Sequence, residues 1–217
     1  MTNIDQIEAN PAAALARLRN QPVQARSTAR VEKLLDATAA IVDEIGYERL
    51  TTAMVAERAG ASIGTLYRYY PDRLAVLNGL RSRLVQRLEE RYAAALEADP
   101  TGSLEDWLHT VLNIYVEMYR TEPGFRAIRF GDPIDDERQG FAGKSNGVIA
   151  AFLAERAVSR FNLTNDPEDL AYRFEVLVEI AESLVHRAYS AGTDQPDERF
   201  IAEVRSIAAW YLETYIR

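Results

Sequence analysis

A short run of polar side chains near the first third of the chain can make the contacts that nucleic acid requires. Thr65, Tyr67, Arg68 and Tyr69 bring a hydroxyl, two phenols and a guanidinium to the outward side of one short predicted helix. Such groups suit the base edges and the phosphates of DNA. Thr52 opens a preceding short helix, where the helix dipole favours an anion, and its hydroxyl can donate to a phosphate. These residue types predict a DNA-contacting surface.

Two short helices joined by a tight turn are predicted to position this surface. The first covers residues 52–59 and the second residues 63–70, where Pro71 ends it. Gly60 stands where the turn requires a positive φ, and Ser62 can cap the second helix through its hydroxyl. The residues expected to face inward are Val55, Ala59, Ile63 and Leu66. The order is that of a helix-turn-helix, although an ordinary helical hairpin in a bundle has the same local signals.

The remainder of the chain is predicted to be helical, because apolar residues recur at intervals of three and four. The expected helices cover residues 28–45, 73–96, 104–121, 148–161, 167–189 and 197–216. Gly46 ends the first of them, and Asp72, Ser103 and Asp166 are suited to cap later ones. Residues 1–27 form either a short helix from Pro11 or a loosely ordered arm. Residues 131–147 contain four glycines and predict a mobile loop.

Composition excludes several classes of protein. The absence of cysteine excludes a disulfide scaffold and thiolate chemistry, and two histidines are too few for a three-histidine zinc centre. No apolar run approaches the ~20 residues of a membrane span. The first residues have neither the basic nor the apolar segment of a secretory signal, so a cytoplasmic location is expected.

The charge is unevenly distributed along the chain. The net charge is −8, but residues 58–87 contain six arginines against the single acid Asp72. A basic module on an acidic body can hold a polyanion locally. A solvated arginine face is the alternative interpretation.

Residues 28–77, about 50 of the 217, resemble the DNA-binding domain of the TetR family of repressors. The resemblance rests on Ala59-Gly60-Ala61-Ser62, on Gly64-Thr65-Leu66-Tyr67 and on Tyr69-Tyr70-Pro71-Asp72-Arg73 followed by Leu77. It implies an all-α protein with an N-terminal three-helix DNA-binding domain and a C-terminal helical domain for ligand binding and dimerisation. The implied divisions are an arm at 1–27, a helix-turn-helix domain at 28–74 and a helical domain at 75–217.

The resemblance also implies individual roles in DNA binding. The residues expected at the interface are Thr52, Ser62, Gly64, Thr65, Tyr67, Arg68, Tyr69 and Arg73. Gly64 stands where the backbone approaches DNA closely, and Arg73 replaces the common lysine that holds a phosphate. Tyr70 is expected to pack rather than to read DNA. Ala53 departs from members that carry a base-reading arginine, so their operator sequence does not carry over.

For the second half, the resemblance implies a homodimer through the last two long helices and a near-palindromic operator, with recognition helices about 34 Å apart. It also implies a pocket for an apolar or aromatic effector. The residues expected to line it are Trp107, Tyr115, Met118, Tyr119, Phe130, Phe152 and Phe174, although aromatic residues at helical spacing also build ordinary cores. Arg126 and Arg129 flank the region and can meet an acidic group.

The expected function is that of a ligand-responsive transcriptional repressor, without enzymatic activity, cofactor or metal. One alternative is a helical interaction protein of the same fold that does not bind DNA. A second is an all-α metalloenzyme that uses a helix face bearing carboxylates and a histidine. That face consists of Glu175, Glu179, Glu182 and His186, and a solvated charge stripe is the favoured interpretation of it.

Overall fold

The protein is entirely helical in the part that the computed structural model describes, residues 11–98, 102–128, 130, 145–190 and 195–216. Side chains are described from Ser27 onward, except that of Ser145. The helices are α1 (Pro11–Ile45), the 3-10 helix η1 (Tyr47–Arg49), α2 (Thr52–Arg58), α3 (Ile63–Tyr69), α4 (Arg73–Ala98), α5 (Leu104–Thr121), α6 (Ser145–Phe161), α7 (Pro167–Ala188) and α8 (Glu198–Tyr215). The prediction of an all-α protein is confirmed.

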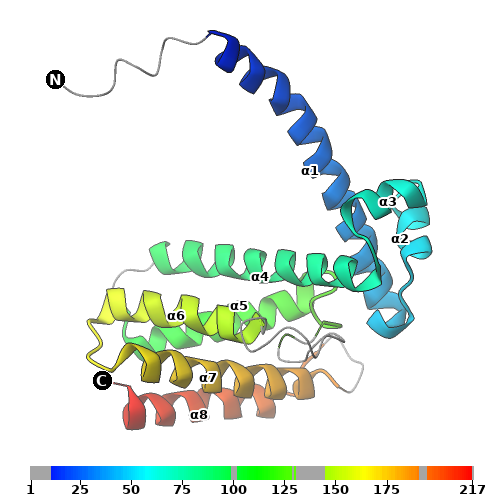
Figure 1. Cartoon of the computed structure of the whole chain (residues 1–217). Helices are drawn as coiled ribbons and strands as arrows, with labels where there is room; N and C mark the ends of the chain where they lie inside the picture. The colour runs from blue at the N-terminus through cyan, green and yellow to red at the C-terminus, as the bar shows by residue number, and fades with distance from the viewer. Residues whose placement is uncertain (1–10, 99–101, 129, 131–144, 191–194, 217) are drawn as a thin grey trace, which may run out of the picture.

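The helices form two groups that share α4 (Figure 1). Helices α2 and α3 lie with the C-terminal half of α1 at one end of the molecule, while the N-terminal half of α1 projects away from it. Helices α4 to α8 run side by side as a bundle in which α7 packs between α6 and α8. The α4 helix starts at the small group and extends along the bundle, so it belongs to both.

Side-chain caps fix the starts of the helices. Ser62 and Asp72 each accept a hydrogen bond from the backbone N–H three residues further on, at 3.1 and 2.8 Å. Ser103 forms a reciprocal capping box with Asp106, and Asp166 caps α7 ahead of Pro167. These predicted caps are confirmed, because each satisfies N–H groups that the first turn of a helix leaves without a partner.

Two segments near the predicted boundaries differ from the expectation. Of the two alternatives for residues 1–27, the helix from Pro11 is the one observed, but it is not short: it continues to Ile45 without a break at Thr28, because Ala- and Leu-rich sequence follows a proline that suits a first helical turn. The α6 helix begins at Ser145, three residues before the predicted start at Val148. The rest of the predicted mobile loop, residues 131–144, lies outside the described residues.

One continuous apolar core runs through both groups of helices. It includes Leu34 of α1, Val55 of α2, Leu66 of α3 and Leu80 of α4, and it continues to Ile201 in α8. The group formed by α2, α3 and the C-terminal half of α1 therefore does not have a core of its own, and a shift of α4 displaces side chains in both groups. Within the described ranges no helix is long and apolar enough to cross a membrane.

Candidate functional site

The turn between α2 and α3 has the geometry of a helix-turn-helix. Gly60 takes a φ of 62°, in the left-handed region that glycine adopts without strain. Val55 and Leu66 are completely buried and hold the two helices together. The prediction that Ile63 faces inward is wrong: its side chain is 42% exposed, because the first residue of α3 lies ahead of the face that meets α2.

Hydroxyl groups form two pairs at α3. Tyr67 is 50% exposed, and its phenol oxygen lies 3.3 Å from the hydroxyl of Thr52 at the start of α2. The hydroxyl of Thr65 lies 2.9 Å from that of Ser62. Four of the residues predicted to contact DNA are thus paired two by two, and each hydroxyl keeps capacity for a further hydrogen bond.

The remaining predicted DNA contacts differ in how freely they face solvent. Gly64 and Arg68 are exposed. Tyr69 is half-buried, and its phenol accepts a hydrogen bond of 3.3 Å from Ser27 of α1. Arg73 is also half-buried and donates through Nη2 to the carbonyl of Tyr47, at 3.0 Å. Part of the Arg73 guanidinium is thus engaged within the fold, and this contact with Tyr47 was not predicted.

Tyr70, which follows α3, packs inward as predicted. A Cβ built on Gly79 of α4 would lie 2.7 Å from Cε1 of its ring, so α4 passes directly over the ring. Burial raises the pKa of the Tyr70 phenol. This contact joins the end of α3 to α4.

Most of the arginines in the basic stretch are not available to a polyanion. Arg58 forms a bidentate pair with Glu44 of α1, at 2.8 and 2.7 Å. Arg83 is buried and pairs with Glu32 and Asp36 of α1 at 3.2 and 2.7 Å. The interpretation of residues 58–87 as a basic module therefore overstates its free charge, because the acidic partners come from outside the stretch.

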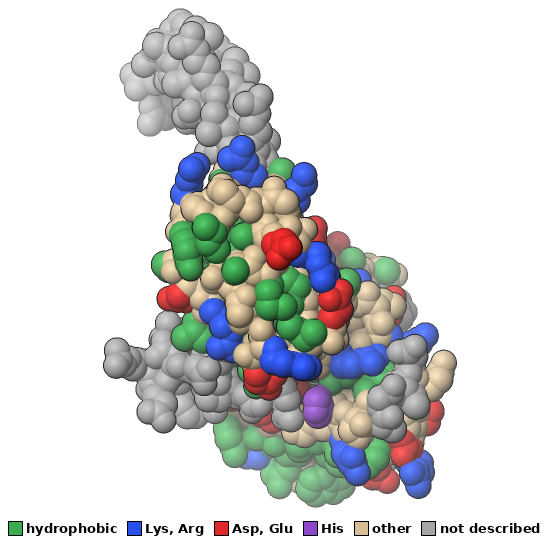
Figure 2. Space-filling view, turned by 90° about the vertical axis from the view of Figure 1, so that its right-hand side faces the viewer, with side chains coloured by type: hydrophobic (Ala, Val, Ile, Leu, Met, Phe, Trp, Pro, Cys, Tyr) green, Lys and Arg blue, Asp and Glu red, His purple; other side chains and the backbone are tan. Residues whose placement is uncertain are grey.

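Arg68 remains the exposed cation of α3, and it forms no ion pair with any residue that the structure describes. Figure 2 views this end of the molecule, where Lys and Arg side chains lie around the rim of a face that is largely apolar and neutral polar. Such a face fits a duplex whose bases meet its middle and whose phosphates meet its rim.

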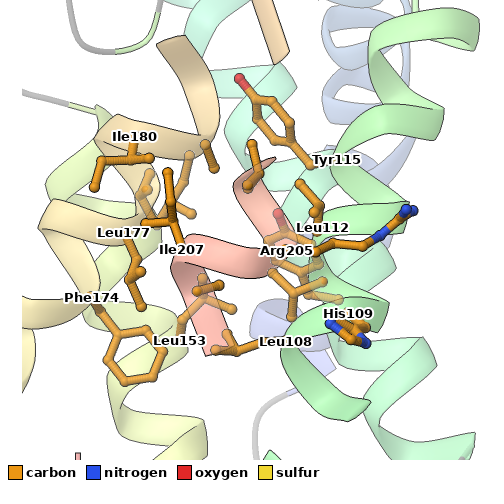
Figure 3. Close-up of a pocket in the computed structure, with 17 residues that line it drawn as sticks. Leu108, His109, Leu112, Tyr115, Leu153, Phe174, Leu177, Ile180, Arg205 and Ile207 are labelled. Carbon is orange, nitrogen blue, oxygen red and sulfur yellow. The ribbon is translucent and has the colours of Figure 1, made fainter. Parts of the chain in front are cut away.

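A second candidate site is a cavity inside the helical bundle (Figure 3). It comprises ≈ 680 Å³ of space not filled by atoms, part of it open to solvent. All five bundle helices contribute to its wall, including Tyr92 of α4. Most lining side chains are aliphatic, for example Leu112, Leu153, Leu177 and Ile207. The mostly apolar lining with a few polar groups is that of a small-molecule site.

The predicted pocket residues divide between this cavity and the surrounding core. Tyr115 and Phe174 line the cavity. The other five do not: Trp107, Met118, Tyr119, Phe130 and Phe152. Trp107 packs edge-on against Phe161 and Phe174, Tyr119 stacks on Tyr189, Phe130 contacts Phe125, and Phe152 lies against Tyr92. Met118 is completely buried.

Two polar lining residues, His109 of α5 and Arg205 of α8, were not predicted. They belong to helices whose apolar spacing predicts a core, and the sequence does not indicate that the two helices meet. Arg126, which was expected to flank the pocket, lies over the ring of Tyr189 at 5.1 Å and does not line the cavity. Arg129 lies outside the described residues.

The face of α7 that carries the glutamates was expected to be a solvated charge stripe, but its centre is buried. Glu182 is 3% exposed and accepts hydrogen bonds from the N–H of Phe130 at 2.5 Å and from Asn146 at 2.7 Å. His186 lies 2.7 Å from the phenol oxygen of Tyr119. Both residues thus hold neighbouring segments against α7. No three His, Asp or Glu side chains among those described are grouped so that they can hold a metal ion.

A network of charged groups links the end of α5, a helix that lines the cavity, to α4 and α1. Glu122, just after α5, pairs with Arg87 and with Arg91 of α4, the second at 3.4 Å. The next turn continues the link, because the N–H of Gly124 donates to Asp43 of α1 at 2.8 Å. The end of α5 therefore contacts α4 and α1 together.

Comparison with known proteins agrees with this architecture. Residues 34–80 match the family model described as bacterial regulatory proteins, tetR family, and residues 102–216 match that of the tetracyclin repressor-like C-terminal domain. A TetR-family transcriptional regulator from Streptomyces coelicolor is 33% identical. The similarity covers 86% of this chain and 99% of that one, with a TM-score of 0.73. The fatty acid degradation regulator FadR from Bacillus halodurans has the same fold, with 14% identity, a TM-score of 0.62, and coverage of 82% of this chain and 93% of that one.

Among curated proteins, the transcriptional repressor KstR of Rhodococcus jostii is 40% identical over 62 residues. That match covers 29% of each chain, so this protein is matched to less than a third of the repressor's length. The two family models together cover both groups of helices. The chain belongs to the TetR family of regulatory proteins.

Proposed function

We propose that the protein is a ligand-responsive transcriptional repressor that acts in the cytoplasm, binds a palindromic operator as a homodimer and releases it when a small molecule binds. The observation that carries this proposal is the course of α4. Only three residues separate the end of α3 from the start of α4, and Tyr92 near the other end of α4 lines the cavity. One rigid element thus extends from the cavity to the DNA-contacting surface.

The DNA-binding role is supported by the exposed side of α3. Tyr67, Thr65 and Thr52 present hydroxyl groups on one surface, and Arg68 adds an exposed cation beside them. These polar groups are not required to attach α3 to the rest of the fold, because Leu66 is completely buried on the other side of the helix and already anchors it. The curated relatives KstR and BetI, both named as transcriptional regulators, support a regulatory rather than a catalytic role.

Dimerisation through α7 and α8 is supported by exposed aromatic side chains on both helices. Tyr172 of α7 and Trp210 of α8 are 57% and 58% exposed. Arg173 lies over the ring of Tyr215 at 4.2 Å and joins the two helices at this place. Large aromatic residues enriched on one face are typical of an interface core, and two such helices per subunit form a four-helix contact about a two-fold axis.

Release of the operator by an effector is supported by the contacts that α4 makes with α5 and α1. An effector that moves α5 or α4 displaces Glu122 relative to Arg87 and shifts the turn bound to Asp43. The recognition helices of the dimer then no longer match the spacing of one DNA turn. Coupling of this kind amounts to about 1–3 kcal/mol, or a roughly 5–150-fold change in affinity.

The experiment that tests the proposal is selection of binding sites from random DNA, followed by titration of the selected site. Wild type is compared with Tyr67→Ala and with a matched pair, Arg68→Gln and Arg58→Gln. We expect wild type to select a palindrome. Tyr67→Ala is expected to weaken binding to that palindrome. Arg68→Gln is expected to lower the affinity and to decrease by about 1 the slope of log affinity against log salt concentration. Arg58→Gln changes little, because this arginine is already paired with Glu44.

The result can contradict the proposal in two ways. If wild type selects no site even at low salt, the protein does not read DNA and the helical interaction protein becomes the better description. If Tyr67→Ala and Arg68→Gln both bind the selected site with wild-type affinity, the DNA-binding surface lies elsewhere on the molecule.

A further inference from the structure

The cavity in the bundle is asymmetric in its polarity. Figure 3 shows Ile180, Leu177 and Phe174 on one side, and Arg205 and His109 on the other. No lining residue among those described is Asp or Glu. The wall is therefore apolar at one end and carries a guanidinium and an imidazole at the other.

Arg205 has a positive charge that the fold does not neutralise. Its Nη2 donates to the side-chain oxygen of Asn113 at 3.1 Å, and this partner is a neutral amide. No ion pair of Arg205 occurs within the described part of the chain, whereas Arg58, Arg83 and Arg87 all have carboxylate partners. Asn113 is exposed and follows His109 by one helical turn on α5, so the guanidinium lies at the solvent-facing edge of the cavity, on the side of the imidazole.

We infer that the effector is an amphiphilic carboxylate, with an aliphatic body in the apolar part of the cavity and its acid group against Arg205 and His109. This inference rests on the proposed function only in treating the cavity as the effector site. A carboxylate gains charge-assisted hydrogen bonds from a guanidinium that no acidic side chain occupies. A neutral ligand gains weaker hydrogen bonds from Arg205. A cationic ligand loses hydration when it enters the cavity, and no carboxylate in the lining compensates for that loss.

The lining of the space specifies the body of the ligand. Most of the lining side chains are aliphatic, and Leu112, Leu153 and Leu177 come from three different helices. A flexible alkyl chain fits between aliphatic side chains of several helices better than a rigid fused ring system, because it can bend to follow the wall.

The test uses three probes with the same ten-carbon chain and different head groups: decanoate, 1-decanol and decylammonium. Each is titrated into the full-length protein by calorimetry, below the concentration at which it forms micelles. Wild type is expected to bind decanoate about tenfold more tightly than 1-decanol, and decylammonium most weakly. Equal affinities for the three probes, or a preference for decylammonium, overturn the inference.

Two variants locate the head group. Arg205→Gln is expected to lower decanoate affinity about tenfold and to leave 1-decanol unchanged, while Arg205→Lys restores most of the preference. Arg126→Gln, which removes an arginine over Tyr189 outside the cavity, is the matched control and is expected to change neither. Loss of both ligands to the same extent in Arg205→Gln, in a protein that melts as wild type does, also overturns the inference. If Arg205→Gln does not fold, the wild-type head-group series decides alone.

A parallel titration with the selected operator separates this inference from the proposed function. If the protein binds DNA but does not prefer decanoate, the effector chemistry is wrong and the repressor proposal stands. If it prefers decanoate through Arg205 but selects no DNA, the ligand site stands and the repressor proposal fails.

Discussion

Gly64 and Gly79 both lie inside helices, but a methyl group added at the two positions meets different surroundings. At Gly64 in α3, the nearest neighbour of an added Cβ is the Ser62 hydroxyl oxygen at 4.0 Å, which is an ordinary contact. At Gly79 in α4, the added atom lies 2.7 Å from the ring of Tyr70. The first glycine is thus not required by the fold, and its presence on the exposed side of α3 needs another reason.

We therefore expect the two alanine variants to have opposite effects. Gly64→Ala is expected to raise the free energy of unfolding by about 0.5–1 kcal/mol, because alanine favours helix, and to weaken operator binding if the backbone approaches DNA there. Gly79→Ala is expected to lower the free energy of unfolding by about 1–3 kcal/mol through overpacking against Tyr70. Urea unfolding and operator titration measure both. A Gly64→Ala variant with normal DNA affinity would argue against a close approach at this position.

The pair formed by Glu44 and Arg58 predicts a pH dependence of stability. The hydrogen bonds from Arg58 hold the pKa of the Glu44 carboxyl below its usual value. A lowered pKa in the folded state adds stability above the pKa of an unfolded glutamate, about 4.3, and this stability is lost as pH falls through the folded value. Wild type should therefore exceed Glu44→Gln in unfolding free energy at pH 7, and the difference should vanish at acid pH. A difference that persists unchanged at low pH would show that the charge is not its source.

At the scale of helices, the end of α5 is the element that connects the two sites. Its last turn carries Glu117, and Glu122 follows directly. The Glu122 side chain is 8% exposed and pairs with Arg87 and Arg91, while Glu117 is 64% exposed and lies 3.9 Å from Arg91. A buried carboxylate held by two arginines transmits a displacement better than an exposed carboxylate, because fewer alternative positions are open to it.

The two glutamates therefore provide a matched test of coupling. Glu122→Gln is expected to reduce the coupling free energy between effector and operator by about 0.5–2 kcal/mol, while Glu117→Gln leaves it unchanged. The measurement is operator affinity with and without saturating effector. The affinity of each variant for the effector alone serves as the control. Equal coupling in the two variants would place the connection in α4 alone.

The starts of the helices were predictable from sequence because capping is local. Ser62, Asp72, Ser103 and Asp166 satisfy backbone groups within three residues, so their effect does not depend on the rest of the fold. The direction of Ile63 was not predictable in the same way. It depends on how α3 crosses α2, and this crossing is a tertiary property.

The DNA-contacting surface and the cavity were predictable to different degrees, because the first is built from local sequence and the second depends on tertiary packing. The residues predicted to contact DNA lie within a stretch of 22 positions, from Thr52 to Arg73, and a recognisable motif spans them. The cavity is lined from five helices, and its aliphatic residues have the spacing of any buried stripe. Likewise, Arg58 and Arg83 looked free because their carboxylate partners lie on α1, at least 14 residues away in the chain.

At the scale of the whole molecule, the shared core determines how binding at one site affects the other. Buried residues extend without interruption from α1 to α8, so the DNA-binding group moves with α4 and not as an independent domain. In the proposed two-fold dimer, a small rotation of each subunit about a contact through α7 and α8 would change the separation of the two α3 helices. Operator affinity then depends on the dimer as much as on the contacts of one subunit.

This dependence is tested at Trp210, the most exposed of the large apolar side chains that the structure describes. Trp210→Ser is expected to weaken the dimer by about 2 kcal/mol or more, since buried tryptophans contribute strongly to interfaces, and to lower operator affinity because each subunit then binds a half-site alone. Val158→Ser on α6, where valine is 40% exposed, is the matched control and should change neither. Sedimentation velocity over a concentration series measures the first effect, and operator titration measures the second. If Trp210→Ser remains a dimer with wild-type affinity, the subunits associate through another face, and the two-fold spacing of α3 must be derived from that face instead.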